Sequence, residues 1–199
     1  TGDLAQAYPL ARGTAPLLVT VGGIALVSEV PGPLALGGIL LLSAGTFVMS
    51  MRGGGLGAVG GRAAGYALLT SVFIAGYTLT DGSGARSAAD ATSYAAWLFL
   101  FEGIWSVAFC VLLRGGGAVR RMLPEWRVGL AGGFLSAVAY WIAMWAMTKA
   151  PIAAVAALRE TSILFAMALS VTMLGERLTR WRVAAALMIV GGVVALRLG

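Results

Sequence analysis

The chain has 199 residues, of which 59% are hydrophobic and 11% are charged, and its formal net charge at pH 7 is +6. Since a soluble domain averages about 25% charged residues, this composition excludes an ordinary soluble domain. With no His and one Cys, the chain cannot form an internal disulfide, and neither a metal site nor another cofactor is expected. The arginines stand mostly at the ends of apolar blocks, which is typical of helices anchored at a lipid interface and not of a nucleic-acid surface.

The apolar residues come in long blocks, several of them free of charge over about the 20 residues that a helix needs to cross about 30 Å of hydrocarbon. Barrel strands would be about 10 residues long and would alternate in polarity. The sequence therefore predicts an all-α integral membrane protein in the lipid bilayer. Seven transmembrane helices are expected, over residues 4–27, 32–51, 62–80, 92–113, 127–148, 152–174 and 181–198.

Short signals set the boundaries of these helices. Pro9 and Pro16 fall in the first helix, where each removes a backbone hydrogen bond, so a kink or break is expected there. The run Asp81-Gly82-Ser83-Gly84 predicts the end of the third helix. Pro151 starts the sixth helix, where its missing N–H is not needed.

The two ends of the chain repeat one another. Residues 1–52 align with residues 148–199 at a constant offset of 147 and without a gap. Internal repeats in an apolar chain are typical of secondary transporters. Matched positions include Arg12 with Arg159, Thr14 with Thr161, Leu17 with Leu164, Glu29 with Glu176, Leu40 with Leu187 and Gly45 with Gly192.

The repeat predicts the domain organisation. Residues 53–199 form one complete copy of five helices, and residues 1–52 form the last two helices of an earlier copy. About three helices of that first copy are missing, so we expect an N-terminally truncated chain from a ten-helix parent. An odd number of helices per copy gives the two copies opposite orientations, which is the inverted-repeat (5+5) plan of many transporters.

The end of the chain resembles a known family. The run of residues 150–158, followed by Gly175-Glu176-Arg177-Leu178-Thr179 and by Gly191-Gly192-Val193, resembles the end of a repeat in EamA-type transporters of the drug/metabolite transporter superfamily. This resemblance implies ten helices in two inverted five-helix repeats. It also implies ATP-independent export or exchange of small metabolites, and both termini in the cytoplasm.

The basic residues favour a different orientation. The predicted loops on one side hold nine arginines, and those on the other side hold three basic residues, so the first side should be cytoplasmic and the C-terminus external. Both orientations stay open. The nine are Arg52, Arg62, Arg114, Arg120, Arg121, Arg127, Arg177, Arg180 and Arg182, and the three are Arg86, Lys149 and Arg197.

Arg159 is the first candidate for a substrate-binding residue. It lies eight residues after Pro151, about 12 Å into its helix, where an arginine without a partner costs at least about 2.5 kcal/mol. Glu160 points about 100° away from Arg159, and neighbours in a helix pair poorly, so Glu102 is the candidate partner. Arg159 would bind an anionic group, while Glu102 or Glu160 takes up a proton or a cationic group. The alternative is a structural Arg–Glu bridge between helices.

Arg12 is the counterpart of Arg159 in the repeat, with Gly13 in the place of Glu160. One interpretation places Arg12 at the transport site, because broken helices often line such sites. The other places it near the interface, where its long side chain reaches toward water.

Other candidates carry weaker signals. Asp81 and Arg86 bracket the glycine-rich run and could pair across it, to order a loop or to gate a substrate path. Glu29 ends its helix at the membrane surface and is expected to have a structural role in the turn. Tyr77 and Trp141 belong to aromatic stripes that usually pack or face lipid, but both are candidates for lining a cavity.

The leading hypothesis is a secondary transporter or exporter of a small-molecule substrate in the inner (plasma) membrane, working by alternating access with protons or a counter-substrate. A homodimer is a further expectation, and a nucleic-acid partner is not expected. The alternative is a non-transporting membrane scaffold or partner subunit, which would not need charges inside the membrane. No enzyme is expected, because the sequence has no His and no paired aspartates within a helix.

Overall fold

The computed structural model describes residues 4–50, 61–117, 121, 123–175 and 178–199. These residues form helices and short connections, with no strand among them, which confirms the all-α class. Within them, six helices are long and apolar enough to cross a membrane. The seventh predicted span is the shorter apolar helix Pro33–Met49. Four residues of the sequence argument, Arg52, Arg120, Glu176 and Arg177, lie outside the described residues.

The chain forms two compact units, Thr1–Thr80 with Ala150–Gly199, and Asp81–Lys149. The long helix α3 (Gly61–Ser87) contributes to both. The first unit also holds α1 (Leu4–Gly22), the π-helical turn η1 (Gly23–Val27), α2 (Pro33–Ser50), α7 (Ile152–Arg159), α8 (Ser162–Leu174) and α9 (Arg180–Leu198). The second unit also holds α4 (Ala91–Arg114), the 3₁₀ turn η3 (Leu123–Glu125) and α6 (Trp126–Met147).

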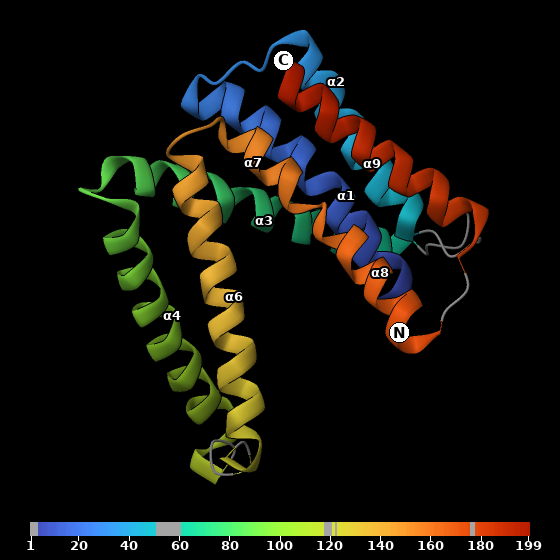
Figure 1. Ribbon diagram of the computed structural model, residues 1–199. Coiled ribbons are helices and arrows are strands. Elements are labelled where there is room, and N and C mark those ends of the chain that lie inside the picture. The colour runs from blue at the N-terminus through green and yellow to red at the C-terminus, as the bar shows by residue number, and fades with distance from the viewer. Residues whose placement is uncertain (1–3, 51–60, 118–120, 122, 176–177) are drawn as a thin grey trace. The chain divides into compact units, whose positions relative to one another are not determined.

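Close backbone contact holds α2 against α9 in the first unit (Figure 1). A Cβ on Gly38 would lie 2.8 Å from the carbonyl oxygen of Gly192, and a Cβ on Gly45 would lie 3.0 Å from that of Ala185. Small residues allow membrane helices to approach in this way. The offset of 147 relates Gly38 to Ala185 and Gly45 to Gly192, so the two contacts are equivalents of each other.

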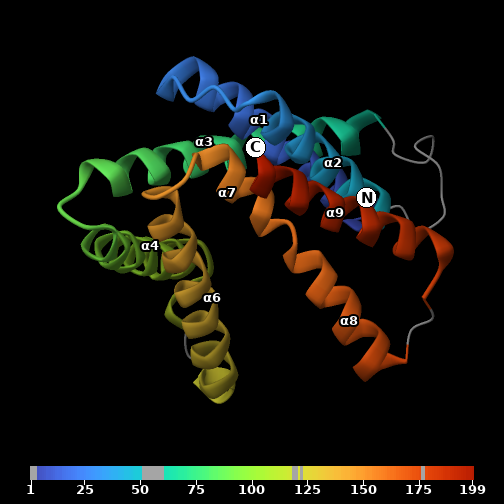
Figure 2. The ribbon, with the colours of Figure 1, turned by 45° about the horizontal axis from the view of Figure 1, so that its top comes forward.

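A second pair of repeated segments, α1 and α7, also lies side by side (Figures 1 and 2). The turn η1 ends at Ser28, whose φ of 57° is left-handed. The side chain of the next residue, Glu29, reaches the start of α7. The Glu29 carboxylate accepts a hydrogen bond of 2.8 Å from the backbone N–H of Ile152, the first residue of α7. A carboxylate at a helix N-terminus is favourable, so Glu29 caps a different helix from the one that it follows.

One expected break within a helix and one expected helix boundary are wrong. Helical backbone continues through Pro9 and Pro16, so neither proline breaks α1. The third helix does not end at residues 81–84 but continues to Ser87. Gly84 does not form a turn but makes room for the ring of Tyr94. A Cβ at this position would lie 2.5 Å from a carbon atom of that ring.

The predicted sixth helix is interrupted, between α7 and α8. Around the interruption, the backbone N–H groups of Glu160, Thr161 and Ile163 bond to the carbonyl three residues earlier instead of four. Such a tightened 3₁₀ turn within a helix often marks a hinge. The break therefore occurs at the charged residues and not at a proline.

The second unit has a small core of its own. Ala85, Ala91, Ala95 and Met144 are buried in it, with Tyr94 and Tyr140 packed against them. Asp90 caps α4 by accepting from the backbone N–H of Ser93 at 2.8 Å. This core brings the end of α3 together with α4 and α6.

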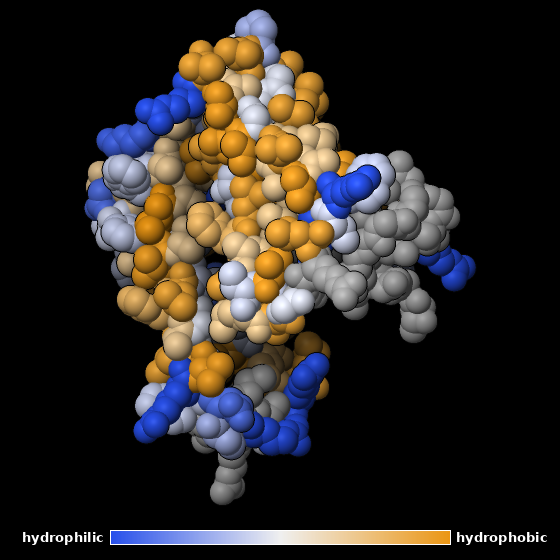
Figure 3. Space-filling model, turned by 45° about the vertical axis from the view of Figure 1, so that its right-hand side comes forward, coloured by the Kyte–Doolittle hydropathy of each residue, from blue (hydrophilic) through white to orange (hydrophobic). Residues whose placement is uncertain are grey.

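Large hydrophobic side chains remain exposed on most helices, including Trp97, Phe101 and Trp105 on α4. On the face drawn in Figure 3, hydrophobic residues cover most of the surface and hydrophilic residues gather in separate groups. This distribution suits a surface that meets lipid. The structure and the lengths of its helices together establish a multi-pass membrane protein.

Candidate functional site

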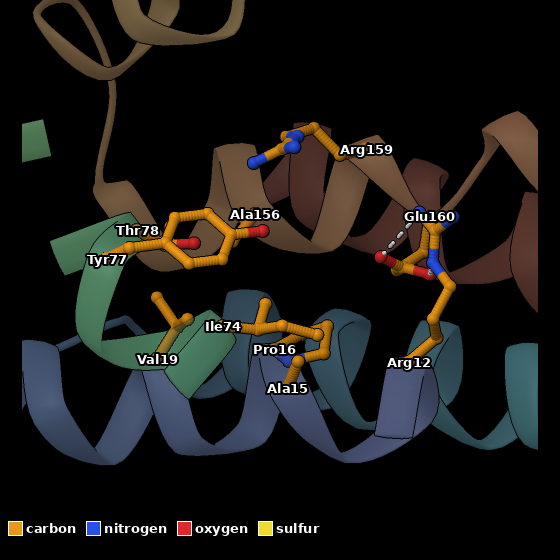
Figure 4. A pocket seen from close by; sticks show the side chains of 10 residues that line it. All are labelled: Arg12, Ala15, Pro16, Val19, Ile74, Tyr77, Thr78, Ala156, Arg159 and Glu160. Atoms are coloured by element: carbon orange, nitrogen blue, oxygen red, sulfur yellow. Dashed lines mark hydrogen bonds and ion pairs between the residues drawn. The ribbon is translucent and has the colours of Figure 1, made fainter. Parts of the chain in front are cut away.

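A cavity of about 220 Å³ opens within the first unit, between α1, α3 and α7 (Figure 4). Three charged side chains and a tyrosine line it among apolar neighbours. The lining residues are Arg12, Ala15, Pro16, Val19, Ile74, Tyr77, Thr78, Ala156, Arg159 and Glu160.

An ion pair closes one end of this cavity. Arg12 donates from Nε to Glu160 Oε2 at 3.0 Å and from Nη2 to Oε1 at 3.1 Å. The side chain of Glu160 is 10% exposed and that of Arg12 is 33% exposed. Two parallel bonds between a guanidinium and a carboxylate are both strong and directional. The pair therefore fixes α1 against the break between α7 and α8.

Arg159 and Tyr77 lie toward the other end. In Figure 4 the guanidinium of Arg159 points away from the Arg12–Glu160 pair, and it lies above the ring of Tyr77. The lining thus contains two guanidinium groups and one carboxylate. An excess of positive charge next to a hydroxyl and apolar walls is suited to a small anion.

The two repeat-related arginines thus reach the same cavity from different helices. Their neighbours differ for a reason that the structure makes clear. A Cβ on Gly13, the counterpart of Glu160, would lie 3.3 Å from both Phe47 Cβ and the Ser43 carbonyl oxygen. Position 13 therefore faces the packing of α1 on α2, and a side chain there would meet α2 and require it to shift by a few tenths of an ångström.

Polar contacts also join α1 and α3, the two helices that carry most of the cavity lining. The hydroxyl of Ser71 on α3 donates to the carbonyl of Ala11 at 2.9 Å and lies 2.5 Å from the hydroxyl of Thr14. Both partners belong to α1, next to Arg12. Sequence reasoning missed Ser71, and no motif distinguishes it from other small residues in α3.

The remaining predicted site residues belong to the second unit. Asp81 accepts hydrogen bonds from Tyr140 Oη at 2.5 Å and from Tyr94 Oη at 3.2 Å, whereas Arg86 Nε donates to the carbonyl of Met147 at 2.7 Å. The expected pairing of Asp81 with Arg86 across a turn is therefore wrong. Trp141 Nε1 donates to Thr92 Oγ1 at 3.2 Å.

Glu102, proposed above as the partner of Arg159, has an exposed side chain in α4 of the second unit. The carboxylate that the structure gives to this cavity is Glu160, and its ion-pair partner is Arg12. The repeat contains a signal for this ion pair, because Glu160 directly follows Arg159, the repeat counterpart of Arg12. If the two copies pack against each other, Arg12 and Glu160 come close together.

A sequence model of the EamA-like transporter family matches residues 62–198. The chain belongs to the EamA-like transporter family. This match confirms the family predicted from the sequence, and it supports a role in transport across a membrane. No curated protein and no solved structure matches the chain.

Proposed function

We propose that this EamA-like protein is a secondary transporter of a small metabolite with an anionic group, and that the cavity between α1, α3 and α7 is its substrate site. The observation that carries the proposal is the position of Arg159 at a cavity whose lining holds one more guanidinium than carboxylate. Ionisable residues within membrane helices usually mark a substrate or ion pathway.

The size of the cavity narrows the substrate class. Sites for drug-sized ligands measure roughly 300–1,000 Å³, and this cavity is smaller, at about 220 Å³. A metabolite with a carboxylate or a phosphate group and few other atoms would fit. Arg159 would bind its anionic group by two parallel bonds, and the hydroxyl of Tyr77 would contact a polar substituent.

The fold supports alternating access as the mechanism. The two antiparallel helix pairs, α2 with α9 and α1 with α7, join segments related by the offset of 147, as expected for two inverted copies that rock against each other around a site. The break between α7 and α8 carries both Arg159 and Glu160 at its edge, so a hinge there would move the site. Protons or a counter-substrate, and not ATP, would drive the cycle. The inner membrane as its location and a homodimer stay predictions.

Transport in proteoliposomes tests this proposal. The full chain is reconstituted, and the uptake of a radiolabelled panel of monocarboxylates, dicarboxylates and phosphate monoesters is measured against empty vesicles. We expect saturable uptake of at least one compound, and its loss in Arg159→Ala.

The matched control is Arg197→Ala, since Arg197 is an exposed arginine of the last turn of α9. It should transport like the wild type. Uptake by Arg159→Ala at the wild-type rate would overturn the assignment of the site. An absence of uptake of every compound by the wild type would favour the scaffold alternative.

A further inference from the structure

We infer that Asp81, held by Tyr94 and Tyr140, is a proton-binding site that couples proton movement to transport. This inference rests on the proposed function for its coupling step but not for its proton binding. The site lies within the second unit, where α3, α4 and α6 meet. It is distinct from the cavity that contains Arg159.

The partners of Asp81 are unusual for an ionised carboxylate inside a membrane protein. The residue is 7% exposed, and it lies in a helix long and apolar enough to span a membrane. Its two carboxylate oxygens each accept one hydrogen bond from a tyrosine, Oδ1 from Tyr94 and Oδ2 from Tyr140. Among the described residues, no arginine or lysine forms an ion pair with it. A buried carboxylate is normally paired with a cation, whereas the donors to Asp81 are neutral hydroxyl groups, so we assign it a proton as its counter-charge.

A path for the proton lies one helical turn away. A second cavity, of about 500 Å³, is bordered by Ala85, Asp90 and Trp145. Ala85 follows Asp81 by four residues, on the same face of α3, and also packs in the core with Tyr94 and Tyr140. Ala85 therefore borders the cavity and lies one helical turn from Asp81, which makes this cavity the route that we assign to water and the proton.

The charged groups near this path come from each of the packed helices. Arg86 on α3, Asp90 before α4 and Lys149 after α6 border the cavity, while Glu102 is exposed further along α4. Arg86 donates to the carbonyl of Met147 and thereby joins the ends of α3 and α6. Two cations near the mouth attract counter-ions and set the local potential that a proton has to cross.

Protonation would change how the three helices are held together. A proton from water adds to one carboxylate oxygen and makes it a donor, with no other bond broken. Oδ1 is the favoured oxygen, because its bond to Tyr94 is the longer of the two. Tyr94 then has to turn from donor to acceptor, while Tyr140 keeps its short bond to Oδ2. Binding of the proton thus alters the hydrogen bond between α3 and α4 and leaves the hydrogen bond between α3 and α6 unchanged.

Infrared spectroscopy of the full chain in lipid bilayers tests proton binding without a substrate. On acidification, the wild type should gain the band of a buried protonated carboxyl group, and Asp81→Asn should lack it. Tyr140→Phe should shift the frequency of this band, because it removes a hydrogen bond from the carboxyl group. Glu102→Gln, which changes an exposed carboxyl group, should leave the band of the buried group in place.

An unchanged band in Asp81→Asn would overturn the inference, whether or not a transported compound is known. If Asp81→Asn does not fold, the test uses Tyr94→Phe and Tyr140→Phe instead. A band that is the same in both variants as in the wild type would also overturn the inference. With a compound that the wild type transports, accumulation driven by a pH gradient should disappear in Asp81→Asn while exchange without a gradient persists. Full gradient-driven accumulation by this variant would contradict the coupling step alone.

Discussion

The two units each bury one acidic residue to the same extent, but they satisfy it in opposite ways. Over the whole residue, Glu160 and Asp81 are each 7% exposed. Glu160 receives two bonds from the guanidinium of Arg12, whereas Asp81 receives two bonds from tyrosine hydroxyls. The first carboxylate is held with its charge matched, and the second is held with no ion pair among the described residues.

This difference indicates different tasks for the two residues. A bidentate ion pair stabilises a single charge state and a fixed geometry, which suits the wall of a substrate cavity. Hydroxyl groups can donate or accept, so they tolerate both charge states of a carboxyl group. Substitutions of Glu160 and of the tyrosines that bind Asp81 separate these two kinds of site by their effect on stability.

Loss of the Glu160 charge should have the largest effect. Removal of one partner of a buried pair costs about 3–5 kcal/mol. Because a third of the Arg12 side chain is exposed, we expect Glu160→Gln to lower the free energy of unfolding by about 2–3 kcal/mol. Unfolding in mixed detergent micelles measures this value.

Two further variants sharpen the same prediction. Glu102→Gln, at an exposed position, should change stability by less than about 0.5 kcal/mol. Replacement of both partners in Arg12→Leu/Glu160→Leu should recover much of the loss, because no buried charge is left alone. A single variant as stable as the wild type would show that the pair contributes nothing to the first unit.

Packing in the first unit can be tested separately from charge. A Cβ on Gly38 would lie 2.8 Å from the carbonyl oxygen of Gly192, whereas a Cβ on Gly37 would have no neighbour within 4 Å. We expect Gly38→Ala to destabilise the protein by about 1–3 kcal/mol through forced separation of α2 and α9. Gly37→Ala should be neutral or slightly stabilising. Equal thermal midpoints of the two variants would contradict this account of the α2–α9 contact.

The two tyrosines of the second unit should differ from each other. Tyr140 makes the shorter bond to Asp81, so Tyr140→Phe should cost about 1–2 kcal/mol and Tyr94→Phe about half as much. Both values are expected to be below that of Glu160→Gln. The comparison of the two units would fail if either phenylalanine variant were the most destabilised of the set.

The smallest effect concerns Asp90, an exposed residue that precedes α4. Hydrogen bonds from the side chain and backbone of Ser93 lower the pKa of Asp90 below its usual value. A group with a lowered pKa in the folded state stabilises the protein above its unfolded pKa, and this contribution is lost as the pH falls through the folded pKa. The wild type should therefore melt above Asp90→Ala at neutral pH and converge with it in acid. A constant difference across this pH range would exclude the carboxylate as the cause.

Much of the architecture could be predicted from sequence because the bilayer imposes long apolar segments. Charge-free blocks located most of the helices to within a few residues. The errors arose where a side-chain signal had a different role. Gly84 makes room for the ring of Tyr94, and the run from Asp81 to Gly84 does not end the helix. The prolines of α1 remain within helical backbone.

The candidate site was predicted only in part. Arg12, Arg159, Glu160 and Tyr77 were candidates from the sequence, and the structure brings all four to one cavity. Their pairing was not predicted, because the partner of Glu160 is 148 residues away and only the packing of the repeated segments brings it near. The bonds of Asp81 to Tyr94 and Tyr140 likewise depend on tertiary contacts that no local pattern records.

Ligand-induced stabilisation tests the central claim, that Arg159 and its cavity bind the substrate, most directly. The thermal midpoint of the full chain is measured with and without each carboxylate and phosphate monoester, for the wild type, Arg159→Ala and Arg197→Ala. A ligand at 100 times its Kd adds about 2.7 kcal/mol of stability. We predict an upward shift of the midpoint for at least one compound in the wild type and in Arg197→Ala, and no shift in Arg159→Ala at an unchanged ligand-free midpoint. The same shift in all three proteins would contradict the account.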